Sequence, residues 1–497
     1  MLNYLKFMTI LAISASALGA QTIKLNESLI ESLAKKGSPQ LDEIEAALLS
    51  TQVREGEENE LFAPEVFGRG SYTETNERAL IGFQPIFSPI KQAQLGVRQT
   101  FKHGVSTSAS IVTDQRSSST SPLAGHFKDA TTTTMSFTVQ LDVWKNLFGR
   151  LSKAKLDSAQ LDSKRAKLEK EIQAKTFQIS LRRLYWSLVA NNEALKISEA
   201  LLETAQTQAK DAAQRLRNAV ADADEVARYK AQVAARQGSV LFLKYQKETY
   251  LKQLRNLLPE LGTNEITLGD YNIEKTMTEV LACTSTIASQ TSVPYGFTKY
   301  DEVVGLLRKI RVNNATVNSR YSDADVSLFG TVKATGVSSE EAAPARYRGS
   351  FGGSIDDIEE QNRTGYEVGV NFTMPLGSVK ENTKRVKELY DEKRLLASIN
   401  GTEAQVVNTH IQLVKSINLL TEVITSQRTS SRELGKRLVG MKRKYEQARV
   451  SVNDLVMDQD AFLNSELTTI DTQLQILNTI FDYLVVYTET PCVFNRN

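Results

Sequence analysis

The sequence has 497 residues, of which 41% are hydrophobic and 24% charged, and its formal net charge is +2. This near-neutral charge argues against a nucleic-acid-binding protein, which normally carries a clustered basic excess. Two cysteines exclude a disulfide-dense scaffold, and three scattered histidines show no ligand spacing. Because nothing resembles a nucleophile, a metal site or a phosphate site, we expect neither an enzyme nor a cofactor.

The first twenty residues predict a secretory signal peptide. Lys6 supplies a positive charge, residues 7–15 form a short apolar core, and small residues follow as far as Ala20. The core is too short to span a bilayer as a retained helix. Cleavage fits either the small-x-small pattern at residues 15–17 or a cut after Ala20. A retained N-terminal anchor is the less favoured alternative.

The remaining sequence contains no run of about 18 apolar residues, so any membrane crossing would have to be made by β-strands in a closed barrel. Two proline-free stretches, residues 150–258 and 376–490, are rich in strong helix formers. Each has about 110 residues, too many for one ordinary helix. Folded as an antiparallel pair, each would give arms of about 50 residues, roughly 75–80 Å long. We therefore predict two elongated coiled-coil hairpins.

A β-strand pattern lies immediately before each helical stretch. The alternating apolar residues are Met135, Phe137, Val139, Leu141 and Val143 in the first half, and Tyr366, Val368, Val370, Phe372 and Met374 in the second. Alternation over about ten residues is typical of a membrane strand with lipid on one face and water on the other.

Further strand candidates lie upstream of these two. The second half offers residues 326–333, and the first half offers 65–73, 93–100 and 105–113, among which the pattern does not decide. We expect two strands per half and about four per chain. Four strands cannot close a membrane barrel, because single-chain barrels begin at about eight. Membrane strands would therefore require several copies of the chain.

The two halves superimpose at a constant offset of 229 residues. Phe137 falls on Tyr366, and Glu225 falls on Asp454, without an insertion between strand and hairpin turn. An internal duplication of a unit made of strands and a helical hairpin is the simplest interpretation.

Three segments carry a resemblance to a known family. They are the helix Leu-Asn-Glu-Ser-Leu-Ile-Glu-Ser-Leu at residues 25–33, the strand-to-helix segment Tyr-Glu-Val-Gly-Val-Asn-Phe-Thr-Met-Pro-Leu at 366–376, and Asn-Leu-Phe-Gly at 146–149, where the first half departs from Pro-Leu. These motifs follow one another in the same order as in the TolC family of outer-membrane efflux and secretion channels, and the strand-to-helix motif occurs twice. The sequence resembles that family over nearly all of its length.

The resemblance implies a mainly α fold with transmembrane β-strands, built from two repeats of strands plus a long helical hairpin. It implies a homotrimer whose shared 12-stranded β-barrel is continuous with a periplasmic α-helical barrel. The expected segments are a signal peptide (1–20), an N-terminal helix of the periplasmic or equatorial region (21–60), strands and an extracellular loop (61–148), a helical hairpin (149–260), an equatorial linker (261–299), a helix leading to the second repeat (300–320), its strands and loop (321–377), its hairpin (378–489) and a C-terminal tail (490–497).

The implied function is the outer-membrane exit duct of a tripartite efflux pump or a type I secretion system, a passive channel gated at its periplasmic helical end. The implied partners are a periplasmic adaptor (membrane fusion) protein, an inner-membrane pump and outer-membrane lipid, with no nucleic acid. The implied location is the outer membrane of a Gram-negative-type envelope, with a large periplasmic part. A periplasmic adaptor or a structural coiled-coil envelope protein is the alternative, but neither needs a doubled unit with membrane strands.

By the same resemblance, Glu225 and Asp454 match acidic gate residues and Tyr445 matches a gate tyrosine. A basic residue usual in the family falls on Val450, which leaves the neighbouring Arg449 as its candidate substitute. The residues of the adaptor-docking turns are Asn218, Ala219, Val220, Gln447 and Ala448, where the family usually has Gly in place of the two alanines.

Two further expectations concern the same regions. The patterns Asp222-x-x-Glu225 and Ser451-x-x-Asp454 both fit a capping box at the start of a returning helix, so the acids have a structural interpretation as well. The resemblance also places Cys283 and Cys492 in one equatorial layer, which makes them a candidate disulfide.

Overall fold

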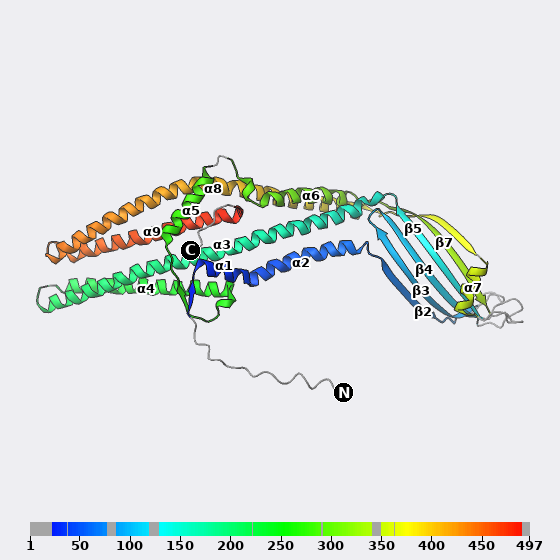
Figure 1. The fold of residues 1–497 in the computed structure, drawn as a ribbon, viewed down its shortest axis with the longest axis horizontal. Coiled ribbons are helices and arrows are strands. Elements are labelled where there is room, and N and C mark those ends of the chain that lie inside the picture. The colour runs from blue at the N-terminus through cyan, green and yellow to red at the C-terminus, as the bar shows by residue number, and fades with distance from the viewer. Residues whose placement is uncertain are drawn as a thin grey trace, which may run out of the picture. The chain divides into compact units, whose positions relative to one another are not determined.

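The computed structural model describes residues 22–36, 38–76, 86–118, 129–220, 222–289, 292–339, 349–361 and 363–489. The predicted signal peptide and Cys492 lie outside these residues. The chain divides into two compact units. The helical unit comprises Met1–Ala47, Leu168–Val303 and Gly401–Asn497, and the sheet unit comprises Leu48–Lys167 and Val304–Asn400. The elements are labelled in Figure 1.

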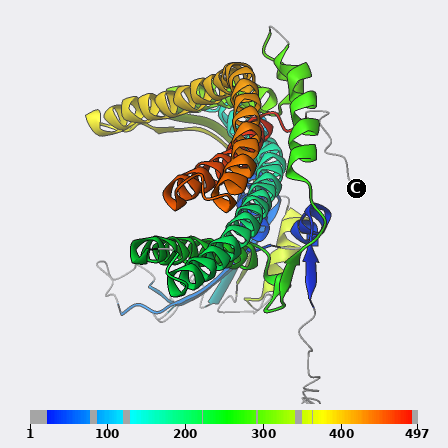
Figure 2. The same cartoon turned by 90° about the vertical axis from the view of Figure 1, so that its left-hand side faces the viewer.

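Four long helices dominate the chain and form two antiparallel hairpins (Figure 1). They are α3 (Arg150–Arg217), α4 (Ala223–Leu257), α8 (Ser378–Glu446) and α9 (Val452–Val486). Shifting the first two by 229 residues gives 379–446 and 452–486, so the helix bounds of the two halves agree to within one residue. Figure 2 views the molecule from the side on which both hairpin turns lie.

The prediction of equal arms of about 50 residues is wrong, because α3 has 68 residues and α4 only 35. In the sheet unit the start of α3 lies beside α6 (Tyr300–Ser319) instead of its hairpin partner. There the Ser158 hydroxyl donates to the side-chain oxygen of Asn314 at 2.8 Å. In this part of the chain the neighbour of α3 is therefore α6 and not α4.

The N-terminal segment 21–60 is not a single helix. It forms the strand β1 (Ile23–Leu25), then α1 (Glu27–Lys36) and α2 (Pro39–Glu60). Pro39 begins α2, where a missing backbone N–H costs nothing and the fixed φ suits the first helical turn. Strand β1 pairs in parallel with β6 (Ile266–Leu268), and α5 (Ile273–Ala288) follows in the same unit.

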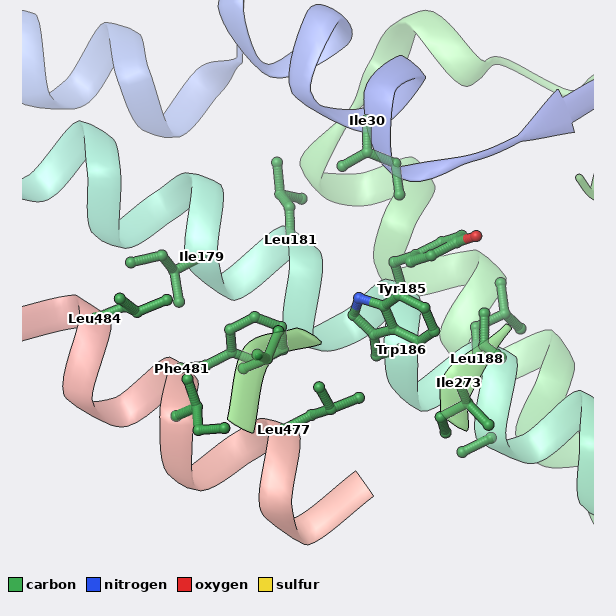
Figure 3. Close-up of a cluster of buried hydrophobic side chains, with 14 of the residues drawn as sticks. Ile30, Ile179, Leu181, Tyr185, Trp186, Leu188, Ile273, Leu477, Phe481 and Leu484 are labelled. Carbon is green, nitrogen blue, oxygen red and sulfur yellow. The ribbon is translucent and has the colours of Figure 1, made fainter. Parts of the chain in front are cut away.

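The core of the helical unit lies where these small elements meet α3 and α9. Figure 3 shows Leu181 of α3 pointing toward α1, which carries Ile30, while Phe481 lies on the α9 side of α3. Leu181 and Phe481 are fully buried, and the rings of Tyr185 and Trp186 meet edge to face with centroids 5.3 Å apart. Burial of these large apolar side chains fixes the short elements of this unit against its long helices.

The sheet unit contains one six-stranded antiparallel sheet in the order β2-β3-β4-β5-β7-β8. The strands are β2 (Glu65–Thr73), β3 (Phe87–Phe101), β4 (Val105–Ser118), β5 (Asp129–Asp142), β7 (Asp325–Ser339) and β8 (Thr364–Thr373). The prediction of about four strands is therefore wrong, since all three upstream candidates of the first half are in the sheet. A tight turn at Gly104, whose φ of +78° suits glycine, joins β3 to β4.

The two faces of the sheet differ sharply in polarity. Residues directly opposite one another on neighbouring strands point to the same side of the sheet, and one such row is Val97, Ala109, Phe137, Val332 and Tyr366. All exposed large apolar side chains of the described strands lie on this side, which we call the apolar face. The opposite polar face carries cross-strand pairs of hydroxyls and amides, namely Ser110–Ser136, Thr134–Thr335, Thr138–Thr331 and Gln140–Ser327.

No helix within the described ranges combines the length and the apolar character that crossing a membrane would require.

A short helix, α7 (Phe351–Gln361), covers one end of the apolar face. The Thr133 and Ser354 hydroxyls lie 2.6 Å apart, and the Asp357 carboxylate accepts from the backbone N–H of Val337 at 2.8 Å. A Cβ atom at Gly336 would overlap the backbone oxygen of Ser354. The absence of a side chain at Gly336 therefore permits α7 to lie directly on β7.

We expect Gly336→Ala to lift α7 from the sheet, because overpacking against backbone costs about 1–3 kcal/mol. Hydrogen exchange of residues 351–361 should become about tenfold faster or more. Gly330→Ala is the matched control: Gly330 lies on the same strand and face, and its added Cβ would meet no atom within 4 Å. Equal exchange in α7 for the two variants would contradict this account.

Candidate functional site

The hairpin turns hold the residues that the sequence singled out, and the two turns have the same backbone. Ala219 and Ala448 both have a φ of +56°, in the left-handed region. The backbone N–H of Val220 donates to the C=O of Arg215 at 2.9 Å, and the equivalent bond in the second turn joins Arg449 to Lys444 at 2.8 Å. This is the Schellman arrangement, which normally places glycine at the left-handed position. The five predicted docking residues are all exposed.

The two returning helices begin differently despite their similar sequences. Ser451 caps α9, because its hydroxyl accepts from the Asp454 N–H while the Asp454 carboxylate accepts from the Ser451 N–H, completing a capping box. The equivalent Asp222 makes no side-chain cap bond at the start of α4. The capping-box prediction is therefore confirmed for Asp454 and wrong for Glu225.

Glu225 instead contacts the other hairpin. Its carboxylate accepts from the Tyr445 hydroxyl of α8 at 2.8 Å, and that hydroxyl accepts in turn from the Arg215 guanidinium of α3 at 3.2 Å. The Arg215 guanidinium also lies 5.0 Å from the centre of the Tyr445 ring, within cation–π range. We call these three residues the hairpin tie, because they join one hairpin to the other at their turns.

A small apolar cluster packs against Tyr445 of the hairpin tie. Tyr229 of α4 is fully buried there with Ala212, Val226 and Val452, so both hairpins contribute. Burial raises the pKa of Tyr445 and its hydrogen bond to Glu225 raises it further, while Tyr229 and the charge of Arg215 offset part of the rise. The Tyr445 hydroxyl therefore keeps its proton, and its role as donor to Glu225, throughout the physiological pH range.

A second polar contact joins the hairpins about three turns beyond Glu225 along α4. The Arg236 side chain is only 5% exposed, and its guanidinium donates to the C=O of Leu201 at 2.9 Å and to the Asp460 carboxylate at 3.1 Å. The Gln232 amide donates to Gln459 at 3.2 Å in the same layer. Burial lowers the pKa of Arg236, an effect that the nearby Asp460 opposes. A buried guanidinium needs such partners, because an unpaired buried charge is strongly destabilising.

The structure thus brings together only some of the predicted gate residues. Glu225 and Tyr445 are in contact, whereas Asp454 is engaged in its own cap. Arg449 is exposed, and its side chain makes no hydrogen bond or ion pair with the part of the chain that the structure describes. The basic residue in contact with Tyr445 is Arg215.

Sequence reasoning missed Arg215 and Arg236. The only available signal for Arg215 was that the 229-residue offset places it on another basic residue, Lys444. Cys283 is disulfide-bonded, while Cys492 lies outside the described residues. Among the described residues, no cluster of three or more His, Cys, Asp or Glu side chains is arranged to hold a metal ion.

Ala219→Gly and Ala448→Gly should each stabilise their turn by about 1 kcal/mol, because an L side chain is disfavoured in the left-handed region. Hydrogen exchange at the turn amides should slow accordingly. Asn218→Gly and Gln447→Gly are matched controls at the preceding position, where φ is negative and glycine should weaken the turn. If all four glycines weaken the turns alike, the left-handed alanines are not under strain.

Comparison with known proteins gives a fold but no sequence family. No protein-family model matches the sequence, and no curated protein matches it. Solved structures do: the outer membrane protein VceC from Vibrio cholerae has 13% identity and a TM-score of 0.64, with 93% of this chain and 96% of that chain covered. The Campylobacter jejuni CmeC outer membrane channel has 13% identity and a TM-score of 0.60, with 93% and 86% covered.

The Neisseria gonorrhoeae MtrE outer membrane channel, solved in its open state, has 12% identity and a TM-score of 0.57, with 95% of this chain and 90% of that chain covered. These likenesses extend over nearly the whole length of each pair, although the sequences have diverged. The chain therefore has the fold of the TolC-like outer-membrane channels.

Proposed function

We propose that this protein is the subunit of a homotrimeric outer-membrane channel, the exit duct of a tripartite efflux pump or a type I secretion system. The observation that carries the proposal is the two-faced sheet. Side chains as large as Tyr366 and Val368 are 87% and 80% exposed on its apolar face, while hydroxyls and amides line the other. Such a sheet suits lipid on one side and a water-filled lumen on the other.

The proposed channel closes at the hairpin turns. The hairpin tie and the buried contacts of Arg236 hold the two hairpins of one chain together, so opening the turns requires these bonds to break or rearrange. Glu225 and Asp454 lie beside the turns, and three copies of each would place six carboxylates around the periplasmic mouth. Such a ring favours cations. The capping role of Asp454 is compatible with this charge.

The exposed turns are the proposed docking surface for a periplasmic adaptor, which connects the duct to an inner-membrane pump. A groove of about 370 Å³ between α4 and α9 lies next to them. Its lining combines apolar and charged side chains, including Val452, Val456, Arg228, Arg236 and Asp460. That combination fits a helical partner that buries an apolar stripe and pairs its charges at the rim.

Tyr445→Phe should favour the open channel, because it deletes the hydroxyl that joins Arg215 to Glu225 while keeping the ring. In planar bilayers we expect more frequent opening and a larger mean conductance than in the wild type. Tyr245→Phe is the matched control, since Tyr245 is 69% exposed on α4 and its hydroxyl bonds to no described residue. Because the pKa of Tyr445 is raised, alkaline opening of the wild type should require a higher pH than deprotonation of a free tyrosine. Unchanged gating of Tyr445→Phe would refute the role of the hairpin tie.

Glu225→Gln and Asp454→Asn test the proposed acidic mouth. Both substitutions remove charge, and glutamine keeps an oxygen that can accept from Tyr445. We expect lower cation selectivity and a weaker response of conductance to divalent ions in each variant, measured by reversal potentials across a salt gradient. If both conductance and selectivity match the wild type, these acids do not line the mouth.

A further inference from the structure

The two edges of the sheet carry an inference that goes beyond the proposed function and rests on it. Strands β2 and β8 each pair on one side only within the described chain. We propose that β8 of one copy pairs with β2 of the next, so that the homotrimer closes a barrel of 18 strands in place of the 12 that the family resemblance implied.

Strand β2 is an integral part of the sheet and not a separate arm. It pairs with β3 at nine consecutive positions, from Glu65 opposite Arg98 to Thr73 opposite Ile90. The Glu65 carboxylate also forms an ion pair with Arg98 at 2.6 Å. Leaving β2 and β3 out of the barrel would break the ladder between β3 and β4, which pairs residue for residue from Ile90 to Phe101.

Strand direction permits closure between copies. All five neighbouring pairs are antiparallel, so an even number of strands makes the two edges run in opposite directions. Strand β2 leads away from α2, and β8 leads toward α8. The edge of one copy therefore meets the edge of the next in the antiparallel sense that prevails throughout the sheet.

The edges also match in length and in face. Strand β2 has nine residues and β8 has ten. On the apolar face, Val66 and Tyr72 of β2 are 74% and 59% exposed, and Tyr366 and Val368 of β8 are exposed still further. Joining the edges would continue one apolar belt from copy to copy, because directly opposed residues of neighbouring strands point to the same face.

The polar face offers complementary groups at the same edges. Arg69 of β2 is exposed, and its guanidinium forms no ion pair within the described residues. Strand β8 carries Glu367 and Asn371 on its polar face, both able to accept from a guanidinium of the neighbouring copy. A single copy cannot satisfy its own edges, because six strands are fewer than the eight at which membrane barrels begin. Unpaired edges do not occur in hydrocarbon.

The consequence is a wide lumen. With strands about 4.8 Å apart and tilted by about 40°, 18 strands enclose a backbone diameter of about 36 Å, against about 24 Å for 12. The polar face, which would line the lumen, carries hydroxyl and amide pairs together with the ion pairs Arg98–Glu65 and Lys333–Glu367. Constriction then belongs to the hairpin turns and not to the barrel.

The proposal is tested with pairs of cysteines placed on β2 and β8, in the full-length protein in lipid. Such a pair can form a disulfide between copies only if β8 of one copy lies beside β2 of the next. Ser71→Cys on the polar face of β2 is combined in turn with a cysteine at a polar-face position of β8, namely Gly365, Glu367, Gly369 or Asn371. The matched controls place the second cysteine one residue away, at Tyr366, Val368 or Val370 on the apolar face. The wild type reports any link made by the native cysteines. Oxidised products are sized by denaturing gel, and the undenatured assembly is weighed by mass spectrometry.

We expect at least one same-face pair to link adjacent chains and no opposite-face pair to do so. The largest cross-linked species on the gel should be the trimer, so that the ladder of bands ends there. A ladder that ends at the dimer would mean 12 strands and would overturn the inference. A trimeric assembly without any same-face link would also overturn it while leaving the proposed function standing. A monomer in lipid without links would refute both.

Discussion

In hydrocarbon, every backbone N–H and C=O group must find a partner within the protein, since each unpaired group costs several kcal/mol. Within the described residues, the sheet unit meets this requirement along five strand pairs, and the outer edges of β2 and β8 have no partner strand. The apolar face of the sheet is nevertheless suited to contact with lipid. In a bilayer a sheet with such a face and two open edges would be incomplete by itself, and the proposed trimer would supply the missing neighbours.

The helical unit has the complementary property that its two hairpins are joined near their free ends. A tyrosine hydroxyl between a carboxylate and a guanidinium is a directional contact, which small displacements of either hairpin disrupt. The buried Arg236 adds a second contact whose loss would leave a charge without a partner. These bonds oppose separation of the hairpins at the site where the proposed channel is narrowest, whereas the proposed barrel is wide.

Local pattern predicted much of this fold. The four long helices follow from proline-free stretches of helix formers, and strands β5 and β8 follow from strict alternation. The number of strands did not follow, because residues 65–73 and 93–100 have only short alternation, and their place in the sheet is decided by pairing with distant segments. Similarly, Asp222-x-x-Glu225 and Ser451-x-x-Asp454 have the same pattern, but Glu225 is drawn to Tyr445 of the other hairpin. Contacts such as that of Arg215 depend on the assembled hairpins and leave no periodic trace in the sequence.

Electron cryomicroscopy of the protein reconstituted in lipid nanodiscs tests the central claim most directly. The account predicts three copies around one lumen, with the apolar face of every sheet against lipid and the polar face toward water. A particle whose apolar face is covered by protein, or a chain that remains outside the lipid, would contradict it.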